Sequence, residues 1–438
     1  MIFIFVTLLI DVLGIGIVIP VIPDLITHFI GVEKFGEESF QQINLAAQAA
    51  KQAGNTSTAT QQLADVVSAA SRWGGILVAC YAITQFFFAP IVGALSDQFG
   101  RRPVLLLTMF GLGLDYLLQA NAPSLGWLFV GRIIAGIMGA SFTSANAYIA
   151  DISTDDNRAR NFGLVGVAFG LGFALGPALG GLLGSYSLRL PFFVSAGLAL
   201  VNWLYGYFVL PESLLPENRS RFTRSKLNPF GALMKMKAYP LVSGLAFAIF
   251  FVSLAQRGLE NVWVYFTKYR YGWEPWDNGR ALGLVGIMAI IVQGGMVRPV
   301  IKRIGERKAV LYGISIAALA FMGYACAYQG WMIPCVIVFG SLGGVAQPAI
   351  QSIVAKSVSP SEQGQMQGAL TSLRSVTSIF APLVFTTGLF NYFTAEAAPV
   401  KLPGSPFFVG SLLQIAALIV IYRLFRRIPE PAELSPSK

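Results

Sequence analysis

Three ionisable side chains stand within long apolar stretches of the first half of the sequence: Asp11, Asp115 and Arg132. Such a group is costly inside a membrane unless it is paired or hydrated, so its presence points to a functional site. Desolvation favours the neutral carboxyl and a nearby guanidinium favours the carboxylate, so a proton and a substrate can compete for such a site. We therefore predict proton coupling by these three residues. The alternative left open is that Arg132 only neutralises one acid and holds helices together.

The depth of the two carboxyls is consistent with a shared site. With a rise of 1.5 Å per residue, Asp11 lies about 13 Å from the start of its predicted helix and Asp115 about 16 Å from the start of its own. Both would therefore reach the middle of the membrane.

The second half offers mainly uncharged polar groups. Arg257 and Glu260 are three positions apart and should pair along one helix face, and Arg374 is a weaker candidate for a cavity. Side chains that would line a substrate cavity or tie helices together are Gln85, Asn146, Asn202, Gln256, Gln293, Gln347 and Gln351, with Arg257 and Glu260 as further cavity candidates.

The elements that position these groups are predicted to be membrane helices. The 438 residues are 55% hydrophobic and 12% charged, with a mean hydropathy of +0.64, which is more apolar surface than one soluble core buries. Residues 2–30 have no basic start and no small-residue cleavage site, so we interpret them as a span and not as a signal peptide. The predicted spans are 2–30, 73–95, 104–121, 124–151, 160–185, 190–210, 238–268, 280–300, 309–329, 331–357, 365–388 and 406–426.

Two six-helix bundles around a central cavity follow from this order. The predicted units are an N-terminal bundle at 1–210 with an insert at 31–72, a linker at 211–237, a C-terminal bundle at 238–427 and a tail at 428–438. A weak internal repeat supports the division, because the loop at 93–103 corresponds to the loop at 302–308. The fold class is thus an all-α membrane protein with twelve spans.

The insert is predicted to form two short amphipathic helices on the outer face. The first carries Ile43, Leu45, Ala46, Ala49 and Ala50 and the second Leu63, Val66, Val67 and Ala70, with a break at Gly54-Asn55-Thr56. Packed decoration, a lid and a docking element are all compatible with this pattern.

Charge excludes some classes of function. The formal charge is +10, but most of the lysines and arginines fall in loops on the side of the N-terminus, so the charge follows the membrane and indicates no nucleic-acid partner. Both termini are therefore expected in the cytoplasm. The basic stretch at 219–237 is expected to face lipid headgroups. No metal cluster, nucleotide loop or nucleophile with its base is visible, which argues against an enzyme.

Glycine spacing gives a further signal near residue 175. A surface without side-chain bulk, where another helix can approach closely, is predicted from Gly172, Gly176, Pro177, Gly180 and Gly181.

Together these motifs resemble the major facilitator superfamily, and within it the bacterial tetracycline/proton antiporters. The resemblance rests on Gly93-Ala-Leu-Ser-Asp97-Gln-Phe-Gly100-Arg101-Arg102-Pro103, on Arg132-Ile-Ile-Ala-Gly136, and on Gly172-Phe-Ala-Leu-Gly176-Pro177-Ala-Leu-Gly180-Gly181. It implies that Asp97, Arg101 and Asp151, supported by Arg102, form a charge cluster that holds the halves together in the outward-facing state. It also implies an antiporter motif at 172–181.

The function implied is export of an amphiphilic small molecule in exchange for protons. The resemblance implies a monomer in the bacterial inner membrane, surrounded by lipid and driven by the proton gradient without a cofactor. The second-half histidine and the span-nine acid of the tetracycline exporters correspond in this chain to Gly272 and about Ala317, so the resemblance does not assign tetracycline. A symporter or facilitator for a metabolite, and a receptor or assembly protein that docks through the insert, stay open as alternatives.

Overall fold

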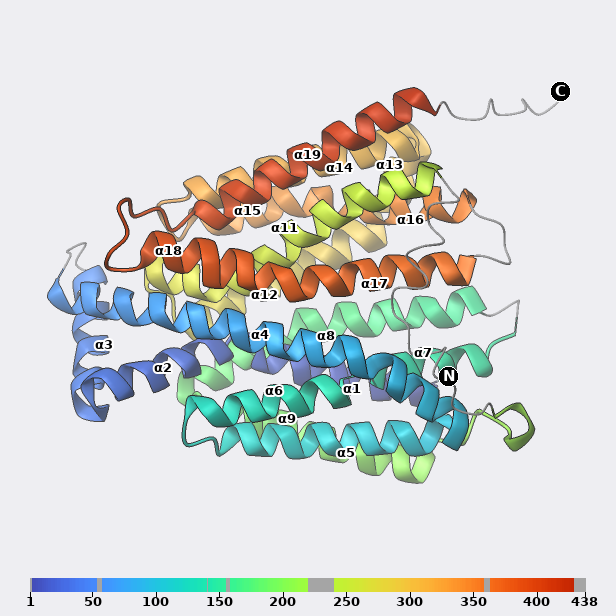
Figure 1. Ribbon diagram of the computed structural model, residues 1–438, viewed down its shortest axis with the longest axis horizontal. Helices are drawn as coiled ribbons and strands as arrows, with labels where there is room; N and C mark the ends of the chain where they lie inside the picture. The colour runs from blue at the N-terminus through green and yellow to red at the C-terminus, as the bar shows by residue number, and fades with distance from the viewer. Residues whose placement is uncertain are drawn as a thin grey trace.

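The computed structural model is a bundle of long helices that run side by side (Figure 1). It describes residues 2–52, 57–139, 141–154, 158–219, 240–357 and 363–428. Within these ranges there are no strands, and 11 helices are long and apolar enough to cross a membrane. The shorter apolar helix Leu125–Met138, followed by a second segment, occupies the place of the remaining predicted span. The all-α membrane fold predicted from the sequence is confirmed.

The helices follow the predicted order. The first half contains α1 (Ile2–Val18), α2 (Ile22–Phe35), α3 (Glu37–Gln52), α4 (Thr58–Phe99), α5 (Arg101–Ala120), α6 (Leu125–Met138), α7 (Ser141–Asp151), α8 (Arg158–Tyr186) and α9 (Leu190–Val209), then the short η1 (Pro216–Asn218). The second half contains α11 (Pro240–Tyr271), α12 (Pro275–Ile290), η4 (Ile291–Met296), α13 (Val297–Ile304), α14 (Glu306–Cys326), α15 (Met332–Ser341), η5 (Leu342–Val345), α16 (Ala346–Lys356), α17 (Gln363–Ala381), η6 (Pro382–Phe390), α18 (Asn391–Thr394) and α19 (Ser405–Arg427).

Several predicted spans are broken into consecutive segments. The first span divides into α1 and α2 near Pro20 and Pro23, because proline cannot donate the backbone hydrogen bond that continues a helix. Spans eight and eleven contain the π-helical segments η4 and η6, and the latter starts at Pro382. Such segments often mark points where a helix bends.

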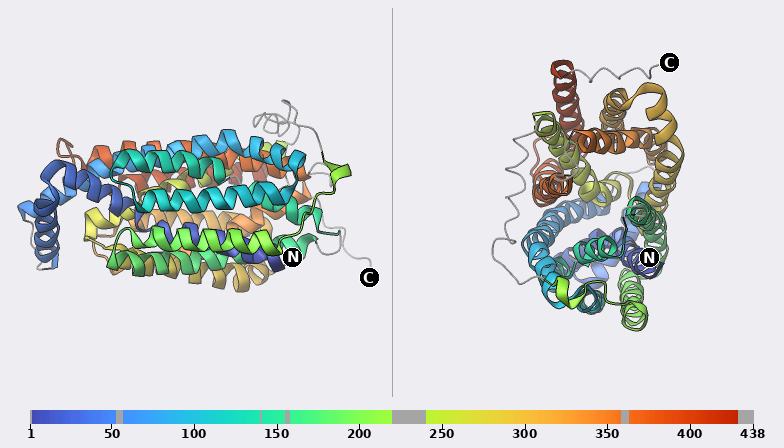
Figure 2. Two further views of the ribbon diagram at one scale, coloured as in Figure 1. Left: turned by 90° about the horizontal axis from the view of Figure 1, so that it is seen from below. Right: turned by 90° about the vertical axis from the view of Figure 1, so that its right-hand side faces the viewer.

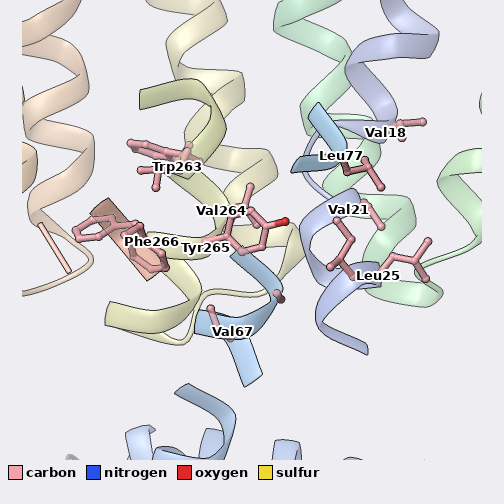
Figure 3. Close-up of a cluster of buried hydrophobic side chains, with 14 of the residues drawn as sticks. Val18, Val21, Leu25, Val67, Leu77, Trp263, Val264, Tyr265 and Phe266 are labelled. Carbon is pink, nitrogen blue, oxygen red and sulfur yellow. The ribbon is translucent and has the colours of Figure 1, made fainter. Parts of the chain in front are cut away.

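The two ends of the bundle differ, and Figure 2 shows them clearly. We call the end that carries α3 the insert end, and the opposite end, near both chain termini, the terminal end. At the insert end, one cluster of buried apolar residues contains members of both halves, such as Leu25 and Leu77 from the first and Tyr265 and Phe266 from the second (Figure 3).

At the terminal end the buried apolar residues form separate clusters. One belongs to the first half and includes Leu8 and Leu105, and another belongs to the second half and includes Val242 and Ile350. Apolar burial therefore joins the halves at the insert end and stabilises each half separately at the terminal end.

Close packing of α8 on α12 shows the same difference. A methyl group added at Gly181 would lie 2.7 Å from the Cα of Gly279, so the two backbones touch there. Added at Gly170 or Gly294, nearer the terminal end, it would meet no atom of the described residues within 4 Å. The structure is thus closed at the insert end and open between the halves toward the terminal end.

The insert differs from the prediction in two ways. Its second helix is not separate but is the start of α4, which runs without interruption into span two, while the predicted break at 54–56 lies outside the described residues. The face of α3 that packs inward contains Phe40 and Ala47, both buried, whereas Leu45 is 67% exposed. The predicted face of the first helix is therefore only partly right, since Leu45, Ala46 and Ala49 are exposed. The apolar residues predicted for the second helix are all buried: Leu63, Val66, Val67 and Ala70.

Candidate functional site

A buried polar chain links α5 and α6 in the first half. The amide nitrogen of Gln119 donates to Asp115 Oδ2 over 2.6 Å, and Arg132 Nη2 donates to the amide oxygen of Gln119 over 2.5 Å. Asp115 is 1% exposed and Gln119 2%. The predicted partners Asp115 and Arg132 are therefore brought together, but through a neutral amide and not as a direct ion pair.

The backbone of α6 leaves room for this carboxyl. A Cβ at Gly131 would lie 2.8 Å from Asp115 Oδ1, so only glycine allows the approach. Within the described residues, Asp115 Oδ1 and Arg132 Nε are buried without a hydrogen-bond partner. A buried polar atom without a hydrogen-bond partner is unfavourable, so both atoms are incompletely satisfied in this conformation.

Asp11 lies in a different hydrogen-bond set. Asn202 of α9, itself fully buried, donates its side-chain amide to Asp11 Oδ1 over 2.8 Å and to the carbonyl oxygen of Thr7 over 3.0 Å. Asp11 is partly exposed, unlike Asp115. Tyr116 lies within electrostatic range of both acids and of Arg132, so the sites are neighbours without direct contact.

One candidate cavity residue ties helices within the first half. Gln85 of α4 donates to the hydroxyl oxygen of Tyr81 over 3.0 Å and to the carbonyl oxygen of Gly139 over 3.3 Å. Its side chain therefore joins α4 to the end of α6.

Other polar candidates are exposed along the spans: Asn146, Gln256, Arg257, Glu260, Gln293 and Gln351. The predicted pair is present, since Arg257 Nη1 lies 2.7 Å from Glu260 Oε2. Arg257 is also within electrostatic range of Tyr81 in the first half. Exposed polar groups are costly against lipid, so their exposure fits a wet space between the halves, and their role as cavity lining stays a prediction.

A charge cluster lies at the terminal end of the first half. Arg101 Nη1 lies 2.5 Å from Asp97 Oδ1 and Arg101 Nε lies 3.1 Å from Asp151 Oδ2. These three residues all belong to the first half, so in this conformation the cluster fixes α4, α5 and α7 relative to one another. The predicted role of the cluster, to hold the two halves together, applies to the outward-facing state and stays a prediction. The side chain of Arg102 instead donates to the carbonyl oxygen of Tyr207 over 2.6 Å.

Glu212 completes this cluster from the end of span six. Its Oε1 accepts from the backbone N–H of Arg101 over 2.9 Å and its Oε2 from the backbone N–H of Arg102 over 3.3 Å, so it caps the start of α5, where helix N–H groups lack partners. This role of Glu212 was not predicted from the sequence.

The glycine motif of α8 packs against two helices. Methyl groups at Gly172, Gly176 and Gly180 would meet Val12, Gly16 and Ile17 of α1 within 2.7 Å. Gly181 and the carbonyl of Pro177 face Gly279 of α12 instead. The predicted small-residue surface is thus used on both sides.

Comparison with known protein families identifies the family of this chain. The model of the Major Facilitator Superfamily matches residues 4–382. The chain belongs to the major facilitator superfamily. It is therefore a multi-pass membrane transporter of this superfamily.

Its similar relatives include several bacterial resistance proteins. The chain is 35% identical to "Tetracycline resistance protein, class C" of Escherichia coli, with 95% of each chain covered. It is 32% identical to the class E protein of Escherichia coli, covering 95% of this chain and 93% of the other. The class H protein of Pasteurella multocida is 30% identical over 97% of this chain and 96% of its own.

Solved structures support the fold. The human organic anion transporter MFSD10 superposes with a TM-score of 0.65 at 24% identity, covering 96% of this chain and 98% of that one. A bacterial homologue of the human lysosomal transporter Spinster superposes with a TM-score of 0.64 at 14% identity, covering 98% and 97%. Both share the facilitator fold.

Proposed function

We propose that this transporter is a proton-coupled antiporter that exports amphiphilic small molecules by alternating access. The observation that carries the proposal is the buried carboxyl of Asp115, which reaches Arg132 only through Gln119. Protonation of Asp115 would remove the charge that orients Gln119 and would release its hold on Arg132. A buried carboxyl that gains and loses a proton can thus bias two conformations.

Several further observations support export in this class. The relatives are named as tetracycline resistance proteins, and the glycines of the α8 motif pack closely on α1 and α12. The excess of basic residues toward the terminal end favours a cytoplasmic location for both termini, in a bacterial inner membrane. We take the protein as a monomer that needs no cofactor beyond the proton gradient.

The central experiment measures proton release. Purified protein in weakly buffered detergent is mixed with tetracycline and other amphiphiles that raise its thermal stability, and a pH dye records released protons. We expect release from the wild type and none from Asp115→Asn, although the ligand still stabilises this variant. The matched control is Asp65→Asn, which removes an acid of the insert bonded to Gln61 and should leave release unchanged.

Unchanged proton release by Asp115→Asn would remove this residue from the mechanism. Transport in proteoliposomes under an imposed pH gradient then decides direction. Substrate movement against the proton flow supports the antiporter, and movement with the proton flow supports the symporter.

A further inference from the structure

A buried ion pair joins the two halves at the insert end. Lys268 Nζ of α11 contacts Asp24 Oδ1 of α2. Asp24 is 2% exposed and Lys268 8%. Neither residue was singled out by the sequence, and neither belongs to the proposed proton site.

A second carboxylate completes a triad around this lysine. Glu274 Oε1 lies 4.0 Å from Lys268 Nζ. Glu274 also caps α12, since its backbone N–H donates to Asp277 Oδ2 over 3.1 Å in a reciprocal capping box. Its position is therefore fixed by the same helix that packs on α8.

The insert reaches this triad directly. Gln48 of α3 donates its side-chain amide to Glu274 Oε1 over 2.9 Å. Because α3 belongs to the first half and α12 to the second, this bond is a further link across the interface. The insert is thus more than decoration of one half.

Neutral hydrogen bonds also join the two halves. Thr394 Oγ1 lies 2.9 Å from Ser68 Oγ, and Asn391 donates to the carbonyl oxygen of Ser68 over 2.7 Å. Thr387 donates to the carbonyl oxygen of Arg72 over 2.9 Å. All these contacts join α4 to the second half, so the triad is not the sole polar link between the halves within the described residues.

We propose that Asp24, Lys268 and Glu274, with Gln48 of the insert, form an ion-pair lock that sets the population of the conformation closed at the insert end. The lock rests on the alternating-access part of the proposed function. When the halves separate at this end, the charges become hydrated and their mutual contacts are lost. The lock biases the equilibrium by the difference between these two environments.

Removal of the lysine should have a definite sign. Without Lys268, the closed state would bury Asp24 without a cation beside it and near a second acid, which is strongly unfavourable. Opening relieves this because both carboxylates meet water. Loss of the cation therefore favours the conformation that is open at the insert end.

The test is a distance measurement across the insert end. Nitroxide labels on cysteines at Glu33 and Glu396, both exposed and one in each half, are placed in a protein whose Cys80, Cys326 and Cys335 are replaced by alanine. Pulsed electron spin resonance then gives the distribution of label distances. For Lys268→Met we expect the long-distance population to rise at least several-fold over that of the background protein.

Two further variants test that charge is responsible. The double exchange Asp24→Lys with Lys268→Asp should return the distribution toward that of the background protein, and Lys268→Arg should keep it unchanged. Arg280→Met is the matched control, because Arg280 pairs with Asp277 on the exposed surface of the same end, and it should change nothing. Elution and thermal unfolding in detergent show which variants are folded.

The contribution of the insert helix α3 to the lock is tested by the variant Gln48→Leu. We expect a shift in the same direction as for Lys268→Met but smaller, whereas Gln61→Leu, on the exposed side of the insert, should give the background distribution. A background distribution for Gln48→Leu would exclude α3 from the lock.

The proposal is overturned if folded Lys268→Met keeps the background distribution, or if Arg280→Met shifts it equally. The measurement uses neither substrate nor a proton gradient. Failure of proton coupling at Asp115 would therefore leave it intact, and failure of the lock would leave proton release by the wild type intact.

Discussion

The two ends of the transporter use the same kinds of contact for different purposes. At the insert end an ion pair crosses from one half to the other, between Asp24 and Lys268. At the terminal end the corresponding pairs remain within one half, as in the pair of Arg101 with Asp151. Contacts across the interface hold a conformation, and contacts within a half make that half a rigid body. Alternating access needs both.

The internal repeat sharpens this comparison. Gly100 and Gly305 occupy corresponding loops, with φ angles of 107° and 81° that favour glycine. The helix that follows begins with a basic residue, Arg101, in the first half and with an acidic one, Glu306, in the second. Glu306 pairs with Lys356 over 2.6 Å. At the terminal end of the first half, the helix after this loop thus starts with a basic residue that pairs with acids. In the second half it starts with an acidic residue that pairs with a lysine.

The largest expected effect comes from filling the close contact of α8 and α12. Gly181→Leu places a side chain where the backbone of Gly279 already lies, and overpacking of this kind costs about 1–3 kcal/mol. We expect transport in proteoliposomes to fall by roughly 5- to 150-fold, since about 1.4 kcal/mol corresponds to a factor of ten. Gly170→Leu adds the same bulk where no atom lies within 4 Å in the described part of the chain, and it should not destabilise the conformation closed at the insert end. If the label distances at the insert end showed an equal loss of that conformation in both variants, the proposed difference in packing between the two ends would be contradicted.

A moderate effect is expected from the cap at the terminal end. Glu212→Ala removes the acceptor for the N–H groups of Arg101 and Arg102 at the start of α5. Loss of such a cap costs about 0.5–2 kcal/mol. Thermal unfolding should therefore occur at a lower temperature, while the label distances across the insert end stay unchanged. A shift of those distances would show that the terminal cluster also acts across the interface.

The smallest effect is expected from the exposed pair of the second half. In the pair of Lys356 with Glu306, the lysine side chain is 70% exposed, and exposed pairs contribute about 0–1 kcal/mol. Lys356→Met should therefore change the unfolding temperature little, and less than Glu212→Ala does. A larger loss of stability for the lysine variant than for the glutamate variant would reverse this ranking.

The spans could be predicted because length and hydropathy are local properties of the chain. Asp115 and Arg132 could be predicted for the same reason, since a charge inside an apolar run is visible without coordinates. The bridging Gln119 could not, because an amide near the end of a span has no distinguishing pattern.

The lock could not be predicted for a different reason. Asp24 and Lys268 are 244 positions apart and lie near the ends of their spans, where charged residues are common. Only the packing of α2 against α11 shows that both are buried. Tertiary contact between distant segments is the information that one sequence does not carry.

The most direct test of alternating access compares both ends in the same background. One label pair at Glu33 and Glu396 reports the insert end. A second pair at Phe99 and Lys302, exposed near the ends of corresponding helices of the two halves, α4 and α13, reports the terminal end. We expect Lys268→Met to lengthen the first distance and to shorten the second, in equal fractions of molecules. Fixed distances at the terminal end, or lengthening at both ends together, would contradict the account.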